Sequence, residues 1–174
     1  MEAVLAYRWI AEKVARLHGL DTALVLAVIA TESSGNTYAI RVERGFWKRY
    51  GANFLAFVKR TLSTFDDRWA QYPDIASCSY GLMQCLYPVA LERGMNLRFP
   101  TELCRAETGI EAGCRQLRYC LDSTALPSRT SDQNLRAGLL RYNGGGDPAY
   151  PDRVLGWLSK INLALRQKPE GASA

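Results

Sequence analysis

The amino-acid sequence predicts a mainly α-helical fold in a single globular domain over residues 1–174. Apolar residues recur at helical spacing in several segments, and these segments are bounded by residues that begin or end helices. The alternating pattern of half-buried strands is nearly absent. With 174 residues, 48% of them hydrophobic, the chain can bury one substantial core but is too short for two full domains.

Two helices are predicted before residue 35. The first is amphipathic and ends at Gly19; its apolar positions are Val4, Leu5, Ile10, Val14 and Leu17. Asp21 is the expected N-cap of the second, which spans 22–32 and is apolar around its whole circumference. A helix of this kind is buried inside its domain, and here its last turn carries Glu32.

Segment 37–77 is less regular and rich in aromatic residues. Helical spacing within it predicts at least one helix, through Phe46, Tyr50, Phe54, Phe57 and Val58. We expect its aromatic side chains to belong to the core rather than to a ligand-binding surface.

The second half of the chain predicts further helices over 101–121, 133–142 and 154–165. The apolar stripe of the first of these is Leu103, Ile110, Cys114, Leu117 and Leu121. Glycines at 144–146 end the second, and the polar tail 168–174 is expected to be frayed.

The charge of the chain favours a polyanionic partner. Its 22 basic and 17 acidic residues give a net charge of +5, which suits nucleic acid, an anionic membrane surface or the bacterial cell wall. The basic residues are scattered rather than clustered in a run, so nucleic-acid binding is not inferred.

Cysteine and histidine usage predicts neither a metal nor another cofactor. The five cysteines are an odd number without a C-x-x-C pair, so we interpret most of them as buried thiols. His18 is the single histidine, and it precedes Gly19 at a helix end, which favours a role in ending that helix.

The N-terminal segment does not have the pattern of an export signal. Glu2, Glu12 and Asp21 interrupt its basic residues, and the apolar run 22–30 is too short to cross a bilayer. We therefore expect a protein that is made without a signal peptide and does not insert stably into membranes.

Three short motifs could carry chemistry. Glu32 at the end of an apolar helix is poorly hydrated, which raises the pKa of a carboxyl group and suits a general acid, although a solvated helix end would have the same sequence. In Gly81-Leu82-Met83-Gln84, the glycine would let the backbone approach a ligand and the amide could bind sugar groups. Tyr142-Asn143 precedes a glycine turn that lacks the lysine of a phosphate-binding loop.

In this order, the motifs resemble the soluble lytic transglycosylases of the lysozyme-like superfamily and their goose-type lysozyme relatives. The matching residues are Glu32-Ser33, Gly81-Leu82-Met83-Gln84, the Ile-x-x-Gly core in 109–113, and Tyr142-Asn143-Gly144. The resemblance covers roughly residues 21–165, including a closing segment that contains Tyr150. It departs from the family in the long interval 37–77, which indicates an insertion, and in Gly35-Asn36, where the family has Asn-Pro.

The resemblance implies a lysozyme-like fold and cleavage of the β-1,4 bond between N-acetylmuramic acid and N-acetylglucosamine. Glu32 would protonate the glycosidic oxygen and then deprotonate the C6 hydroxyl, which closes a 1,6-anhydro ring without a second carboxylate. Tyr142 would hydrogen-bond near Glu32. The residues that would line or brace the sugar subsites are Ser33, Gly81, Met83, Gln84 and Asn143.

Other functions stay open. In a hydrolytic muramidase, an acid in the insertion would hold the attacking water, and the candidates are Glu43, Asp66, Asp67 and Asp74. A non-catalytic peptidoglycan-binding or virion structural module is a third hypothesis. The missing export signal favours a phage endolysin or virion-associated enzyme that acts on the cell wall, although a bacterial enzyme with a dedicated secretion route would share it. We expect a monomer whose partner is the glycan strand.

Overall fold

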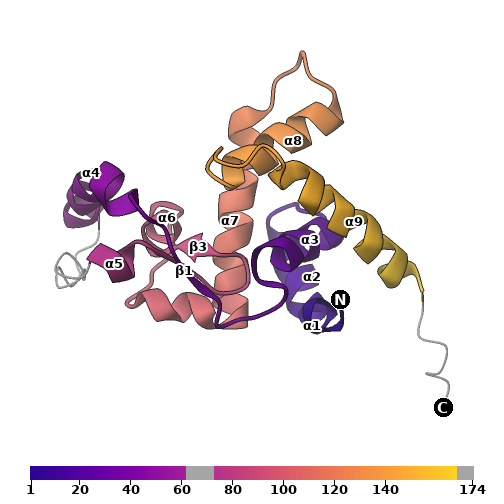
Figure 1. Ribbon diagram of the computed structural model, residues 1–174, viewed down its shortest axis with the longest axis horizontal. Helices are drawn as coiled ribbons and strands as arrows, with labels where there is room; N and C mark the ends of the chain where they lie inside the picture. Colours follow the sequence, from indigo (N-terminus) through magenta and orange to yellow (C-terminus); the bar gives the residue numbers. More distant parts are fainter. Residues whose placement is uncertain (62–72, 168–174) are drawn as a thin grey trace.

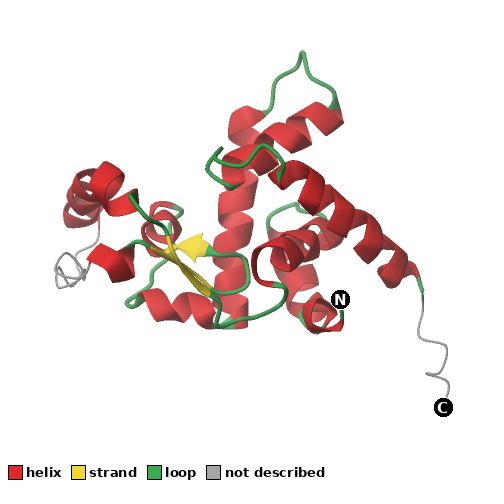
Figure 2. Ribbon diagram, viewed as in Figure 1, coloured by secondary structure: helices red, strands yellow, loops and turns green. Residues whose placement is uncertain are grey.

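The computed structural model describes residues 1–61 and 73–167 and confirms a mainly α-helical fold (Figures 1 and 2). The α-helices are α1 (Glu2–Leu5), α2 (Arg8–Leu17), α3 (Thr22–Ser33), α4 (Phe46–Thr61), α5 (Pro73–Ala76), α6 (Tyr87–Glu92), α7 (Ala106–Thr124), α8 (Ser131–Tyr142) and α9 (Tyr150–Arg166). A 3₁₀ helix covers Pro100–Cys104. The tail predicted to fray, 168–174, lies outside the described residues.

A small antiparallel sheet was missed by the sequence analysis. It consists of β1 (Ile40–Val42), β2 (Cys78–Tyr80) and β3 (Cys85–Leu86), in the order β1-β2-β3. Strands of two or three residues are too short to show alternation in a sequence. Because β1 pairs directly with β2, the chain between them, which includes α4 and α5, leaves the sheet and returns to it.

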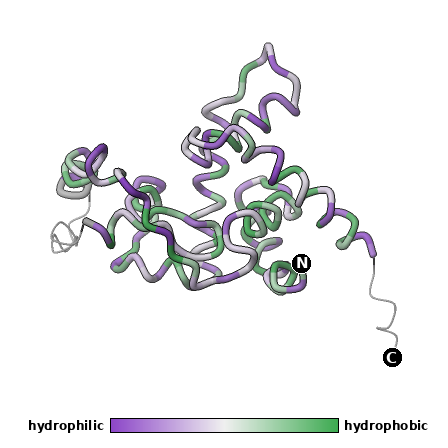
Figure 3. Tube along the Cα trace, viewed as in Figure 1, coloured by the Kyte–Doolittle hydropathy of each residue, from purple (hydrophilic) through white to green (hydrophobic). Residues whose placement is uncertain are grey.

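Helix α3 is buried, as predicted from its composition. The Asp21 carboxylate caps it by accepting a hydrogen bond of 2.8 Å from the Leu24 amide, and every residue from 23 to 30 is buried. Helices α2 and α9 pack against it, so its apolar circumference is covered on several sides (Figure 3). The helix ends at Ser33, and the backbone of its C-cap, Ser34, is left-handed with φ 54°.

Two predicted helices begin or continue differently in the structure. The first is divided into α1 and α2 at residues 6–7, where the sequence has neither glycine nor proline to mark a break. The stretch predicted from Thr101 begins as the 3₁₀ helix, and α7 starts only after Arg105, whose backbone is extended (φ −78°, ψ 129°).

Helix α7 stands between two hydrophobic clusters (Figure 1). Its Ile110 and Cys114 belong to the cluster built around α3, whereas Ala112 belongs to the cluster beside the sheet. A Cβ atom at Gly113 would lie 2.3 Å from Met83 Sδ, so glycine lets the segment before β3 pack tightly on α7. This packing fixes the segment next to the end of α3.

Candidate active site

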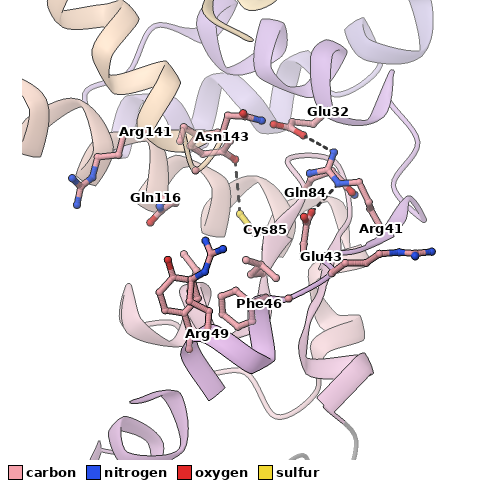
Figure 4. Close-up of a pocket in the computed structure, with 17 residues that line it drawn as sticks. Glu32, Arg41, Glu43, Phe46, Arg49, Gln84, Cys85, Gln116, Arg141 and Asn143 are labelled. Atoms are coloured by element: carbon pink, nitrogen blue, oxygen red, sulfur yellow. Dashed lines mark hydrogen bonds and ion pairs between the residues drawn. The ribbon is translucent and has the colours of Figure 1, made fainter. Parts of the chain in front are cut away.

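The last turn of α3 places Glu32 in a cleft with a volume of about 360 Å³ (Figure 4). The segment from Arg41 to Tyr50 forms one side of the cleft, and residues of β3, α6, α7 and α8 complete its lining. Elements from both hydrophobic clusters therefore contribute to it.

The Glu32 carboxyl is nearly removed from water. Its side chain is 6% exposed, the Tyr150 hydroxyl donates a hydrogen bond of 2.7 Å to Oε1, and Arg41 Nη1 lies 3.8 Å from Oε2. Burial raises the pKa of Glu32, and although Tyr150 and Arg41 oppose this shift, the pKa stays above its usual value. A carboxyl group of this kind holds its proton to higher pH, as a general acid requires.

A second carboxylate, Glu43, faces the same cleft. Arg41 Nε donates to Glu43 Oε1 at 2.7 Å, so one guanidinium contacts both acids. The Ser79 hydroxyl lies 3.0 Å from the same Glu43 oxygen. Asp74 is exposed on α5 and does not line the cleft, whereas Asp66 and Asp67 lie outside the described residues.

Four of the residues predicted for the site line the cleft: Glu32, Gln84, Tyr142 and Asn143. The Gln84 side chain forms hydrogen bonds within the protein: its Nε2 donates to the carbonyl oxygens of Ala39 (3.0 Å) and Gly81 (2.9 Å). Its backbone is left-handed, with φ 48°. Gln84 therefore holds the turn between β2 and β3 and borders the cleft at the same time.

Three other predicted residues lie behind the cleft instead of lining it. Ser33 Oγ donates to Leu82 O at 2.8 Å and thereby joins the end of α3 to the β2–β3 turn. Gly81 has φ +73°, and a Cβ there would lie 2.1 Å from Leu103 O, so the close neighbour is the 3₁₀ helix rather than a ligand. Met83 is fully buried in the core. These residues support the cleft through packing.

The hydroxyl that contacts Glu32 belongs to Tyr150, not to Tyr142 as expected. Tyr142 donates to Met83 O at 2.7 Å, and the two tyrosine rings are stacked with centroids 6.5 Å apart. Burial and the neighbouring Glu32 raise the pKa of Tyr150, which keeps its hydroxyl protonated as a donor. The sequence places Tyr150 in the closing segment of the family resemblance, and the adjacent Pro151 is favoured in the first turn of a helix, but neither signal predicts the contact with Glu32.

Helix α4 has two aromatic faces, of which only one was expected. Trp47 and Phe54 pack in the cluster beside the sheet, with ring centroids 6.1 Å apart. Phe46 and Tyr50 instead line the cleft, and Tyr50 is 46% exposed. The assignment of these aromatic side chains to the core was therefore wrong for Phe46 and Tyr50.

The cysteine side chains show no sign of nucleophilic chemistry. All five are free thiols, four of them buried, and burial raises the pKa of Cys85, which lines the cleft, to about 12. His18 caps the C-terminus of α2, as expected, and pairs with Glu111 at 3.0 Å. In the described part of the chain, no group of three or more His, Cys, Asp or Glu side chains could hold a metal ion.

Among residues 1–61 and 73–167, no helix has the combination of length and apolar character that crossing a membrane requires. Comparison with known proteins found no protein family, curated protein or solved structure that matches the chain.

Proposed function

We propose that this protein is a lysozyme-like peptidoglycan lytic transglycosylase, which cleaves the β-1,4 bond between N-acetylmuramic acid and N-acetylglucosamine. The observation that carries the proposal is the Glu32 carboxyl. It is buried at the end of an apolar helix, its pKa is raised, and it borders an open cleft. The resemblance of the motifs around Glu32, Gln84 and Tyr142 to the transglycosylase family supports the same activity.

Glu32 would act first as an acid and then as a base. It donates its proton to the glycosidic oxygen while the C1–O bond of muramic acid breaks and positive charge develops on the sugar ring. The ionised Glu32 then takes the proton of the C6 hydroxyl as that oxygen bonds to C1. The products are a 1,6-anhydromuramyl end and a free N-acetylglucosamine end, and Glu32 regains its proton.

The neighbours of Glu32 suit both halves of this cycle. Before proton transfer, burial favours the neutral acid; afterwards, the Tyr150 hydroxyl and the Arg41 guanidinium stabilise the carboxylate. The pKa of Glu32 is therefore raised without making its ionised form inaccessible.

Mass spectrometry of fragments released from purified peptidoglycan tests the proposal. The wild-type protein should release anhydromuramyl ends, which are lighter than hydrolysed ends by one water. Glu32→Gln should lower the rate by about 10²–10⁴-fold because the general acid is lost. Unchanged release by a folded Glu32→Gln protein would contradict the mechanism, and no release by the wild type would favour a non-catalytic wall-binding module.

Hydrolysis is the second candidate, and the position of Glu43 in the cleft favours it. Glu43 shares Arg41 with Glu32 and could hold a water for attack on the anomeric carbon. A hydrolase would produce reducing muramic acid ends and would lose this product in Glu43→Gln. A transglycosylase would still form anhydro ends in that variant. Glu107→Gln, at an exposed position in the first turn of α7, is the matched control.

A further inference from the structure

The start of α4 forms the side of the cleft that faces Glu32 (Figure 4). It presents two aromatic rings, Phe46 and Tyr50, with centroids 5.4 Å apart and planes tilted by 47°. Arg44 and Arg49 also line this side, which we call the α4 wall. The wall therefore combines apolar ring surface with positive charge.

The arginines of the α4 wall have no acidic partner among the described residues. Arg41 is paired with Glu43 and Glu32, whereas neither Arg44 nor Arg49 forms an ion pair within that part of the chain. Helix α4 contains no aspartate or glutamate at all. Two guanidinium groups thus line the cleft without a direct ion pair to any acid in residues 1–61 and 73–167.

A third arginine without an acidic partner among the described residues lies at the edge of the cleft, on α8. Arg141 lines it, and its guanidinium lies over the Tyr119 ring, 5.4 Å from the centroid, rather than against a carboxylate. The cleft lining carries four arginines (Arg41, Arg44, Arg49 and Arg141) against two glutamates (Glu32 and Glu43), and a concave surface with an excess of one sign of charge concentrates ligands of the opposite sign. Arginine binds carboxylates through paired hydrogen bonds and is less strongly hydrated than lysine, so it suits this task.

We propose that the α4 wall binds the carboxylates of the peptide attached to muramic acid, so that the cleft selects glycan strands whose peptides carry free carboxylates. This inference rests on the proposed function, because it assumes a peptidoglycan substrate. The sugar backbone alone offers little negative charge to Arg44 and Arg49. A peptide stem supplies several carboxylates, and a guanidinium group binds a carboxylate through paired hydrogen bonds.

Isothermal titration calorimetry of ligand binding to the Glu32→Gln protein tests the proposal without depending on cleavage. The probes are muramyl tetrasaccharides whose peptides have either free or amidated carboxylates, so that size is constant and only charge differs. The free form should bind about tenfold more tightly, the difference expected for a charge-assisted hydrogen bond. Adding Arg49→Gln should weaken binding of the free form more than binding of the amidated form and so reduce the preference.

Lys48→Gln is the matched control, since Lys48 is exposed on the same helix but does not line the cleft. It removes the same charge and should keep the preference. The proposal would be overturned if the two probes bound with equal affinity, if neither bound, or if Arg49→Gln left the preference unchanged. It would also be overturned if polyphosphate displaced the two probes equally well. Failure of the wild-type protein to cleave peptidoglycan while the preference persists would instead refute only the proposed catalytic activity.

Discussion

Tyr150 and Arg41 limit how far burial can shift the protonation of Glu32. Both interactions favour the ionised carboxyl, whereas the surrounding apolar groups favour the neutral one. The balance between burial and these two interactions therefore sets the pH range in which Glu32 can donate a proton.

Tyr150→Phe should move the alkaline limb of the pH profile of kcat/KM to higher pH. The hydrogen bond from Tyr150 lowers the pKa of Glu32, so its removal raises that pKa further and keeps the acid protonated for longer. Tyr142→Phe is the control, because the Tyr142 hydroxyl donates to Met83 O instead. A limb that stays in place in Tyr150→Phe, or moves equally in both variants, would contradict this assignment.

Glu32→Gln should unfold at a higher temperature than the wild type at about pH 8 and lose this advantage below about pH 4. Because the pKa of Glu32 is raised in the folded state, the folded protein loses stability as pH rises through that pKa. A neutral amide avoids the loss. Thermal unfolding across this pH range measures the effect, with Glu107→Gln as the exposed comparison. A Glu32→Gln protein that is less stable at high pH would show that burial does not destabilise the carboxylate.

The residues of the cleft that the sequence predicts are those that local context marks. Glu32 is recognisable because eight apolar residues precede it on one helix, and Tyr142 and Asn143 because a glycine turn follows them. Arg41 and Tyr150 could not be assigned in this way. Their contacts with Glu32 depend on the pairing of β1 with β2 and on the packing of α9 against α3, which are both tertiary.

At the scale of elements, α7 depends on glycine for its contacts with the 3₁₀ helix and with the segment before β3. Gly109 and Gly113 lie one turn apart, and a Cβ at either would approach within 2.4 Å of a neighbour. The helix loses some intrinsic stability at each glycine and gains close packing in return.

Gly113→Ala should destabilise the protein by about 1–3 kcal/mol through overpacking, more than the gain of about 0.5–1 kcal/mol from helix propensity. The new methyl would meet Met83 Sδ at 2.3 Å and Met83 Cβ at 2.5 Å in a fully buried site. Gly156→Ala on α9 has no neighbour within 4 Å and should be neutral or stabilising. Urea unfolding of the pair separates the two effects, and equal changes in both would argue against tight packing at Gly113.

The long helices could be predicted and the sheet could not, for a physical reason. An apolar pattern sustained over three turns, as in α3, favours one structure over its alternatives. A strand such as Ile40–Val42 is defined only by its partner, Cys78–Tyr80, which lies far along the chain. Its side chains are exposed, so no burial pattern marks it in the sequence.

At the scale of the molecule, the described part of the chain has two hydrophobic clusters that share α7 and border the cleft. This arrangement places the acid on one cluster and the α4 wall on the other. The number of residues and their hydrophobic content indicated enough apolar side chains for a core, but not that they divide into two groups. That division depends on which faces of α7 the neighbouring elements cover.

Binding of the protein to purified sacculi should weaken as NaCl rises from about 0.05 M to about 0.5 M. With a net charge of +5, association with an anionic wall is attractive, and salt shortens the range of that attraction to a few ångströms. Sedimentation of sacculi with bound protein measures the effect, and circular dichroism at each salt concentration checks that the fold is intact. Binding that does not change with salt would exclude a major electrostatic contribution.

The direct pairing of Ile40 with Tyr80 brings the two ends of the segment that contains α4 together in the sheet. The chain leaves the sheet after β1 and returns to it at β2, so the segment that carries the α4 wall begins and ends on neighbouring strands. Lengthening such a segment costs little closure entropy, since the cost grows only with the logarithm of its length. A segment of different length or sequence could therefore replace the one between β1 and β2 while Glu32 and the helices around it keep their arrangement. Such a replacement would change the residues that line the cleft opposite Glu32.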